Sequence, residues 1–455
     1  MSHLQLSALR HWKDDPAGRH LLVLLAVALV IRFILAPYPD LFNDMQNFVT
    51  WGLVAEHQFW HLYSATSRFS VPDNYPPLAG ELFVVQVALY VGFFRIIGSH
   101  APLTLTSSPT LSVWMKLPMI AADLGAIVVL YMLARRRMSE RWALFLAATY
   151  AFSPPILVGG VIWGQIDTLF VFPLLLALYF TLERRGLAAG VCFGLAIMLK
   201  PLPLVFAPLF PIYLYRWEGW RQALRFVGGA AGISLILSLP YLMPPRPEVL
   251  AFLQNVQKLE TNGHASDGGF NLWWLVAPNT GYAAPLWGPL SASAIGWGLF
   301  AGALALAIAG IWRSGSEEIL LGAAALLAIA FFDVTTLQHQ RYLYPALALL
   351  LAASFWARGY LSLYLLTSVT FFLNLVITVG MYDKEIPYLT GWYYFINAHL
   401  DTVLVITNGV ALIQLGILIW AVMLFMRRSY GTGGTEVAAK ETGITPAHQG
   451  SIAAL

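Results

Sequence analysis

A single cysteine, Cys192, is present in the 455-residue sequence, so an intrachain disulfide is excluded and the redox compartment stays undetermined. Charged residues are also scarce, at 11% of the chain, against about 25% in a typical soluble domain. Hydrophobic residues make up 58%, and the mean hydropathy is +0.68. This composition excludes a chain of soluble domains and predicts a polytopic membrane protein. The formal net charge of +3 is too small and too dispersed to indicate nucleic-acid binding.

Long apolar runs predict an all-α membrane domain over residues 20–426. We expect about twelve transmembrane helices, at residues 20–36, 113–134, 142–158, 162–182, 187–199, 201–215, 225–243, 289–312, 317–332, 342–357, 360–380 and 403–426. The polar stretch 1–19 is expected to be cytoplasmic and to precede an uncleaved signal-anchor, because no small-residue cleavage signature follows. The segment 427–455 has no apolar run, which is typical of a disordered cytoplasmic tail.

The basic residues give the orientation of these helices. Most of the 26 Lys and Arg residues fall on the side that carries both termini, which the positive-inside rule assigns to the cytoplasm. The rule is obeyed only if the apolar run 78–98 lies in or along the membrane face, because a span there would move Arg135–Arg137 to the other side. We therefore expect horizontal or juxtamembrane helices in the first outer loop, residues 37–112.

The extracytoplasmic side is expected to be the active face. It carries the long predicted loops, whereas the predicted inner loops are short, and loops held by a rigid scaffold commonly carry function. Most of the unusual polar residues also fall on this side: Asp40, Asp44, Asp73, Asp167, His264, Asp267, Asp333, His339 and Asp383.

The first outer loop begins with two acids, Asp40 and Asp44, four residues apart. If this stretch is helical, the spacing places both on one face. A carboxylate just beyond a transmembrane helix can serve as a general base, although a solvated loop acid would have the same sequence. Further along the loop, Asp73 and Tyr75 precede two prolines that begin an apolar helix, which sets both side chains where the chain meets the membrane surface.

Another polar group, formed by Trp163, Gln165 and Asp167, falls at the start of the predicted span 162–182. An acid and an amide at the edge of the hydrocarbon are costly unless they are partnered, so they are candidate functional residues. The alternative is that Asp167 interacts with the dipole at the helix N-terminus and has no further role.

Basic residues on the outer side run against the general trend. Lys200 joins two predicted spans, and His339 and Arg341 precede another. Lys200 could extend to the interface and Arg341 could anchor the surface, but together these residues suit a phosphate that a lipid presents. Their place on the same side as Asp44 and Asp167 favours the functional interpretation.

An outer carboxylate beside outer cations fits the transfer of a sugar from a polyprenyl phosphate. The phosphate departs without protonation, so cations stabilise it and one carboxylate deprotonates the acceptor hydroxyl. Glycoside hydrolysis differs, because its leaving alkoxide requires a second, acidic carboxyl group.

Short motifs occur in a fixed order through this part of the chain. They are Asp44–Trp51, Asp73–Pro77, Lys116–Leu124, Trp163–Thr168, Lys200–Leu202, Phe270–Trp273 and His339–Pro345. This ordered set resembles the bacterial membrane mannosyltransferases related to the GPI-anchor mannosyltransferases, within the GT-C fold of glycosyltransferases that use lipid-phosphate sugars. The chain departs from the family pattern at Leu202, where the family has Gln, and at Gln340, where it has Glu.

The resemblance implies a GT-C-like bundle and an inverting glycosyltransferase acting at the extracytoplasmic membrane face. The enzyme would move a hexose, with mannose as the first expectation, from a polyprenyl-phosphate sugar to an acceptor hydroxyl. Asp44 is implied as the catalytic base, and Lys200, His339 and Arg341 as donor-phosphate ligands. Sugar or acceptor binding is implied for Asp73, Tyr75, Trp163, Gln165, Asp167 and Asn271. The expected partners are the donor, membrane lipids and an unknown glycan, lipid or protein acceptor, without nucleic acid.

Two other classes of protein stay open, a transporter or flippase of a lipid-linked sugar and a structural membrane protein. A transporter predicts ionisable residues near the centres of several spans, but Arg32 and Asp123 are the main ones here. A structural role leaves the outer acids and cations unexplained. No obligate cofactor is expected, because His61, His264 and His339 lack metal-ligand spacing; a loosely held divalent ion is the alternative.

Overall fold

A computed structural model describes residues 16–56, 61–69, 71–242, 248–260, 263–277, 280–384 and 387–430. Most of the predicted cytoplasmic segment 1–19 and of the predicted tail 427–455 lies outside these residues, so both stay predictions. Within the described residues the fold is helical, apart from one antiparallel hairpin of β1 (Pro285–Trp287) and β2 (Leu290–Ser291).

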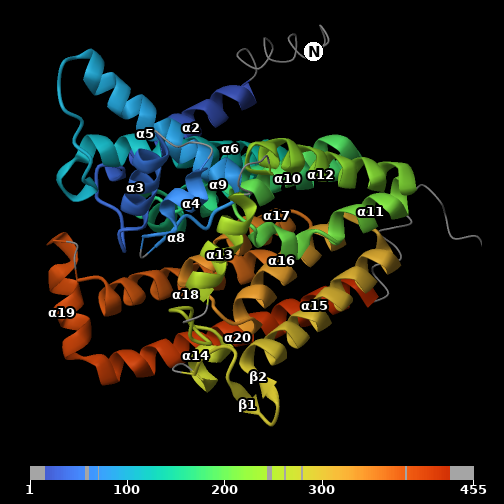
Figure 1. Cartoon of the computed structure of the whole chain (residues 1–455). Helices are drawn as coiled ribbons and strands as arrows, with labels where there is room; N and C mark the ends of the chain where they lie inside the picture. The colour runs from blue at the N-terminus through green and yellow to red at the C-terminus, as the bar shows by residue number, and fades with distance from the viewer. Residues whose placement is uncertain are drawn as a thin grey trace, which may run out of the picture.

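The helices follow one another along the whole described chain (Figure 1). The first half contains α2 (Pro16–Leu35), α3 (Asp44–Glu56), α4 (Leu62–Thr66), α5 (Pro77–Ile96), η2 (Leu105–Ser107), α6 (Pro109–Arg135), α7 (Glu140–Ala151), α8 (Pro154–Ile156), the π-helical turn η3 (Leu157–Ile162), α9 (Asp167–Leu182), α10 (Gly186–Leu199), η4 (Leu202–Phe206), α11 (Leu209–Glu218) and α12 (Trp220–Leu242). The second half contains α13 (Glu248–Glu260), α14 (Leu272–Val276), α15 (Ala292–Ser314), α16 (Glu317–Val334), η5 (Gln340–Leu343), α17 (Tyr344–Ser354), α18 (Gly359–Tyr382), η6 (Pro387–Leu389), α19 (Thr390–Ala398) and α20 (Leu400–Tyr430).

The number of membrane-crossing helices is lower than the sequence predicted. In the described residues, seven helices are long and apolar enough to cross a membrane: α2, α5, α6, α12, α15, α18 and α20. An eighth candidate is the pair α7 and Pro154–Ile162, which is bent by 48°. The chain is therefore an integral, multi-pass membrane protein with seven or eight candidate spans, and the prediction of about twelve was too high.

The difference arises in the interior of the bundle. Helices α9 and α10 are 16 and 14 residues long, and many of their residues are buried. Helix α17 has 11 residues, and every one of these eleven is buried. Helices that are apolar on every side belong in a core, where neighbouring helices cover them. The sequence shows the hydropathy of these segments but does not show where each helix ends. For this reason they were predicted to be transmembrane spans.

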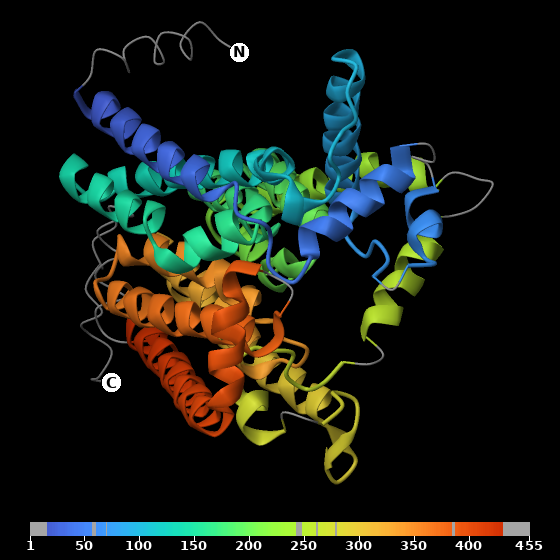
Figure 2. The ribbon, with the colours of Figure 1, turned by 90° about the vertical axis from the view of Figure 1, so that its left-hand side faces the viewer.

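Helix α5 illustrates the same ambiguity. It is one of the seven candidates by length and hydropathy, although the charge distribution placed the run 78–98 along the membrane face. In Figure 2 this helix projects from the rest of the bundle. It packs mainly against α3, so the segment 37–112, predicted to be the first outer loop, contains helices that pack on each other. The orientation of α5 relative to the membrane stays a prediction.

The two ionisable residues predicted within spans pair with each other. The Arg32 Nε donates a hydrogen bond of 2.6 Å to Asp123 Oδ2, and both side chains are buried. The same guanidinium donates to the carbonyl oxygens of Ala28 and Ala151 at 3.0 Å. The contacts with Asp123 and Ala151 link α2 to α6 and α7, so this ion pair connects three helices of the bundle.

Candidate active site

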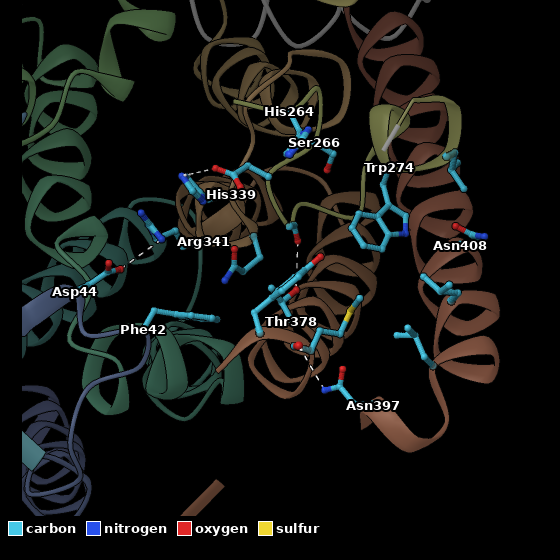
Figure 3. Close-up of a pocket in the computed structure, with 18 residues that line it drawn as sticks. Phe42, Asp44, His264, Ser266, Trp274, His339, Arg341, Thr378, Asn397 and Asn408 are labelled. Atoms are coloured by element: carbon cyan, nitrogen blue, oxygen red, sulfur yellow. Dashed lines mark hydrogen bonds and ion pairs between the residues drawn. The ribbon is translucent and has the colours of Figure 1, made fainter. Parts of the chain in front are cut away.

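Two cavities meet beside residues 42–51, at the start of the segment predicted to be the first outer loop. The larger, of about 890 Å³, is lined by residues of α14, α18 and α20 and by the segments 264–268 and 339–341. The smaller, of about 620 Å³, lies against α3 and the Lys200–Leu202 turn. Four residues line both cavities: Asp44, Asp267, His339 and Arg341. The candidate catalytic base and two of the predicted phosphate ligands therefore stand at the junction. Figure 3 shows Asp44, His339 and Arg341 among the residues that line the larger cavity.

A strained turn presents Asp44 at this junction. Phe42 and Asn43 have φ of 58° and 56°, in the left-handed region that Asn tolerates and bulky residues avoid. Asp44 then begins α3, and the Asp40 carboxylate accepts the backbone N–H of Met45 at 2.7 Å. Asp40 is thus the acceptor that caps the first turn of α3, and burial raises the pKa of its carboxyl to about 6. Asp40 and Asp44, which would share one face if the whole stretch were helical, therefore make different contacts.

The Asp44 carboxylate is held by one amide and one guanidinium. Gln165 Nε2 donates a hydrogen bond of 2.5 Å to Asp44 Oδ2, and Arg341 Nη1 lies 3.4 Å from the same oxygen. The Asp44 side chain keeps 25% of its surface exposed, so it remains open to the cavities. A carboxylate that is oriented but reachable meets the geometric requirement for a general base.

The turn that carries Gln165 depends on a glycine. The π-helical turn η3 ends at Ile162, and Gly164 follows with φ of +77°. A Cβ at Gly164 would collide with Met45 Sδ, next to Asp44. Glycine therefore allows the turn to approach α3 closely enough for the Gln165 amide to reach Asp44. Short π-helical turns inside helical segments are frequent at functional sites.

The three predicted phosphate ligands, Lys200, His339 and Arg341, line the smaller cavity together with Asp44. Lys200 Nζ lies 2.8 and 2.9 Å from the two oxygens of Asp167, and 4.5 Å from the ring centroid of Tyr342. The Arg341 guanidinium lies over the rings of Trp163 and Tyr342, at 5.4 and 5.7 Å. Aromatic faces favour such cations, and they hold the two charges near one another at the cavity wall.

The pKa values of Lys200, His339 and Arg341 depend on burial and on neighbouring charges. Burial lowers the pKa of Lys200 to about 8, although Asp167 opposes the shift. Burial also lowers the pKa of His339 well below its ordinary value, and the nearby Arg341 and Lys200 charges act in the same direction. For Arg341, burial lowers the pKa, but Asp44 and nearby tyrosines outweigh it and raise the pKa overall. At neutral pH, Lys200 and Arg341 are therefore cations and His339 is a neutral imidazole.

The predicted site residues divide into three groups by position. Tyr75 lines the smaller cavity together with Lys200, Asp44, His339 and Arg341. Directly behind the cavity walls, Trp163, Gln165 and Asp167 contact Arg341, Asp44 and Lys200 respectively. Asp73 and Asn271 line neither of the two cavities.

The contacts of Asp73 and Asn271 are with the backbone. The fully buried Asp73 accepts the N–H of Tyr75 at 2.9 Å, and burial raises the pKa of its carboxyl to about 7. Asn271 caps α14, since its Oδ1 accepts the N–H groups of Trp273 and Trp274. Its Nδ2 donates to the carbonyl oxygen of Phe332 at 2.8 Å. Both residues shape the loops around the cavities without reaching the junction.

Several cavity residues had no role assigned from the sequence. Asp267 lies 3.2 Å from His339 Nε2 and lines both cavities. His264 and Phe42 line the larger cavity, and Tyr342 lies between the two cations. The sequence analysis noted Asp267 and His264 as polar residues on a predicted outer loop, but no sequence spacing ties either residue to His339. No group of three or more His, Cys, Asp or Glu side chains among the described residues could hold a metal ion.

Comparison with known proteins places the chain in a family of enzymes. The family model for glycosyltransferase family 87 (GT87) matches residues 75–337. The chain belongs to this family. It is therefore a membrane glycosyltransferase, which confirms the predicted class of enzyme. The matched range of GT87 contains Trp163–Thr168 and Lys200, whereas Asp44, His339 and Arg341 lie outside it.

One curated relative of this GT87 chain carries a different sugar in its name. It is the alpha-(1→3)-arabinofuranosyltransferase of Corynebacterium glutamicum, 26% identical over 196 residues. The alignment covers 38% of this chain and 46% of the relative, so the chain spans less than half the length of that protein. Membership of GT87 thus replaces the narrower mannosyltransferase assignment, and the sugar is a separate question.

Proposed function

We propose that the protein is an inverting glycosyltransferase that moves a hexose from a polyprenyl-phosphate sugar to an acceptor hydroxyl at the extracytoplasmic membrane face. The observation that carries this proposal is the position of Asp44, whose carboxylate lies at the junction of two cavities within 3.4 Å of Arg341. One cavity would hold the donor and the other the acceptor, and the junction is where the two would react.

The donor phosphate fits the smaller cavity. That cavity is lined by Lys200, His339 and Arg341, and a phosphate there would meet two cations and the imidazole. Fixed positive charge stabilises the negative charge that develops on the departing phosphate. No acid is needed to protonate this leaving group, which agrees with the low pKa of His339.

The acceptor fits the larger cavity, on the other side of Asp44. The Asp44 carboxylate would remove the proton from the acceptor hydroxyl as the oxygen attacks the anomeric carbon and the carbon–phosphate oxygen bond breaks. Attack from the face opposite the phosphate inverts the anomeric configuration in a single displacement. Asp267, which lines both cavities, is placed to contact the sugar between them.

Two sugars have support as the transferred group. The motif resemblance favours mannose, which is our first proposal. The name of the corynebacterial relative supports arabinofuranose as the alternative, although it matches only part of either chain. The outer location rests on the distribution of Lys and Arg. Arg136 and Arg184, which the positive-inside rule assigns to the cytoplasm, pair with acids that line neither cavity.

The test is transfer of labelled sugar by the purified protein in detergent. Synthetic polyprenyl-phosphate mannose, glucose and arabinofuranose are supplied in parallel, with a membrane extract as acceptor. A product from one donor confirms the enzyme and names the sugar. The alternative function, transport of a lipid-linked sugar, predicts binding of the donor without product and movement of the lipid across reconstituted vesicles.

A further inference from the structure

A hydrogen bond between two segments far apart in the sequence holds the turn before Asp44. The Asp383 Oδ2 accepts the backbone N–H of Phe42 at 2.7 Å, between residues 341 positions apart. Asp383 directly follows α18 and is 5% exposed. Phe42 is the residue with φ of 58°, so the hydrogen bond acts on the least favourable backbone conformation in the turn.

The turn is fixed from both sides by carboxylates. On one side Asp383 holds the N–H of Phe42, and on the other Asp40 holds the N–H of Met45. Asp44 lies between these two anchored positions. A left-handed conformation at a bulky residue persists only where the surroundings enforce it, because the residue otherwise relaxes to an ordinary backbone region. Losing the Phe42 anchor therefore frees the backbone two residues before the candidate base.

A second contact joins the same two segments. The Tyr388 hydroxyl donates to the carbonyl oxygen of Pro39 at 3.2 Å, and its ring lies edge-on to Tyr38 with centroids 5.5 Å apart. The anchoring segment is also part of the larger cavity, since Met381 and Tyr382 line it together with Phe42. The end of α18 thus contacts both the cavity and the turn that presents Asp44.

We propose that Asp383 is a positioning residue, whose carboxylate holds the Phe42–Asn43 turn so that Asp44 stays at the junction of the two cavities. The catalytic consequence rests on the function proposed above, whereas the structural consequence does not. Asp383 acts through Asp44 and touches no reacting atom in this proposal.

The kinetic test uses Asp383→Ala and Asp383→Asn, with Asp401→Ala as the matched control. Asp401 is an exposed acid at the start of α20. We expect Asp383→Ala to lower kcat by roughly ten- to a hundredfold, the scale of one charge-assisted hydrogen bond, with little change in the KM for the donor. Asp383→Asn keeps a carbonyl acceptor and should recover most of this loss. Equal losses in both Asp383 variants, or a change in KM alone, would overturn the positioning role.

A double-variant comparison separates positioning from general damage. If Asp383 acts through Asp44, adding Asp383→Ala to Asp44→Asn should cause no further loss of transfer. A full additional loss in the double variant would contradict the proposal, since independent effects multiply.

Amide hydrogen exchange tests the clamp without any assay of transfer. Asp383→Ala should speed exchange in a peptide spanning residues 38–46 at least tenfold, while Asp383→Asn and Asp401→Ala should leave it near wild type. Unchanged exchange in Asp383→Ala would refute the clamp. If the wild type transfers no sugar but the exchange result holds, the proposed function fails and the structural part of the inference stands.

Discussion

Replacing Lys200 with Met would leave the Asp167 carboxylate buried without its cation. Both side chains are almost fully enclosed, at 7% and 0% exposed, and both carboxylate oxygens contact Nζ within 2.9 Å. Breaking such a pair from one side costs about 3–5 kcal/mol, because the remaining charge has no partner and no water. We therefore expect Lys200→Met to lower the thermal stability of the purified protein in detergent by several degrees or more.

The loss of activity in that variant would be ambiguous, because an unstable protein also loses turnover. The double variant Lys200→Met with Asp167→Leu removes both buried charges. Replacement of a buried ion pair by apolar side chains is often close to neutral for stability, so the double variant should recover most of the melting temperature.

Binding of a polyprenyl phosphate then distinguishes the two roles of Lys200. If Lys200 contacts the donor phosphate, the double variant should be stable yet bind the lipid at least about tenfold more weakly than wild type, the scale of a charged hydrogen bond. The assay is titration with the labelled lipid phosphate, beside a thermal melt of each variant. Recovery of both stability and donor affinity in the double variant would refute the phosphate-binding role and leave Lys200 as a structural residue.

Two further predictions concern the guanidinium and a buried acid. Arg341→Ala should weaken donor binding by about ten- to a hundredfold, since the phosphate loses a charge-assisted hydrogen bond, and Arg341→Lys should recover only part because Lys lacks the planar donor pair; unchanged affinity in titration would remove Arg341 from the phosphate site. Burial raises the pKa of Asp73 from 3.8 to about 7, so the folded protein retains a proton that the unfolded chain releases. Stability should therefore fall as the pH rises from about 4 to 7, by up to about 4 kcal/mol from this group. Asp40, with a pKa of about 6, acts in the same direction, so Asp73→Asn should flatten the fall in melting temperature only in part; an unchanged pH profile in Asp73→Asn would contradict this assignment.

Among the candidate site residues, the sequence alone singled out those whose polar side chains are costly to place at a membrane edge. Asp167 and Gln165 at a helix start, and Lys200 and Arg341 on the predicted outer side, are energetically costly at a membrane edge without partners. In the structure Lys200 pairs with Asp167, and Gln165 and Arg341 both contact Asp44. The motif order added Asp44, because spacing alone did not separate it from a solvated acid.

The remaining contacts depend on folding that no local pattern encodes. Asp267 meets His339, and Asp383 meets Phe42, across 341 positions in the second case. The left-handed Phe42 has no sequence signature, since glycine would be the expected residue at that conformation. The number of spans failed for a related reason. Interior helices such as α17 are as hydrophobic as spans, and only the folded structure shows that they are short and covered by neighbouring helices.

The most direct test of the account is the transfer rate of Asp44→Asn. This change removes the base but keeps the size of the side chain and an acceptor for Gln165 and Arg341. Single-turnover transfer and binding of the polyprenyl-phosphate sugar are measured together for wild type and variant. We expect donor affinity within a few-fold of wild type and a rate reduced by about a hundredfold or more, the usual scale for a lost general base. Near-normal turnover in Asp44→Asn would show that the reaction does not use this carboxylate, and the assignment of the cavity junction as the catalytic centre would be wrong.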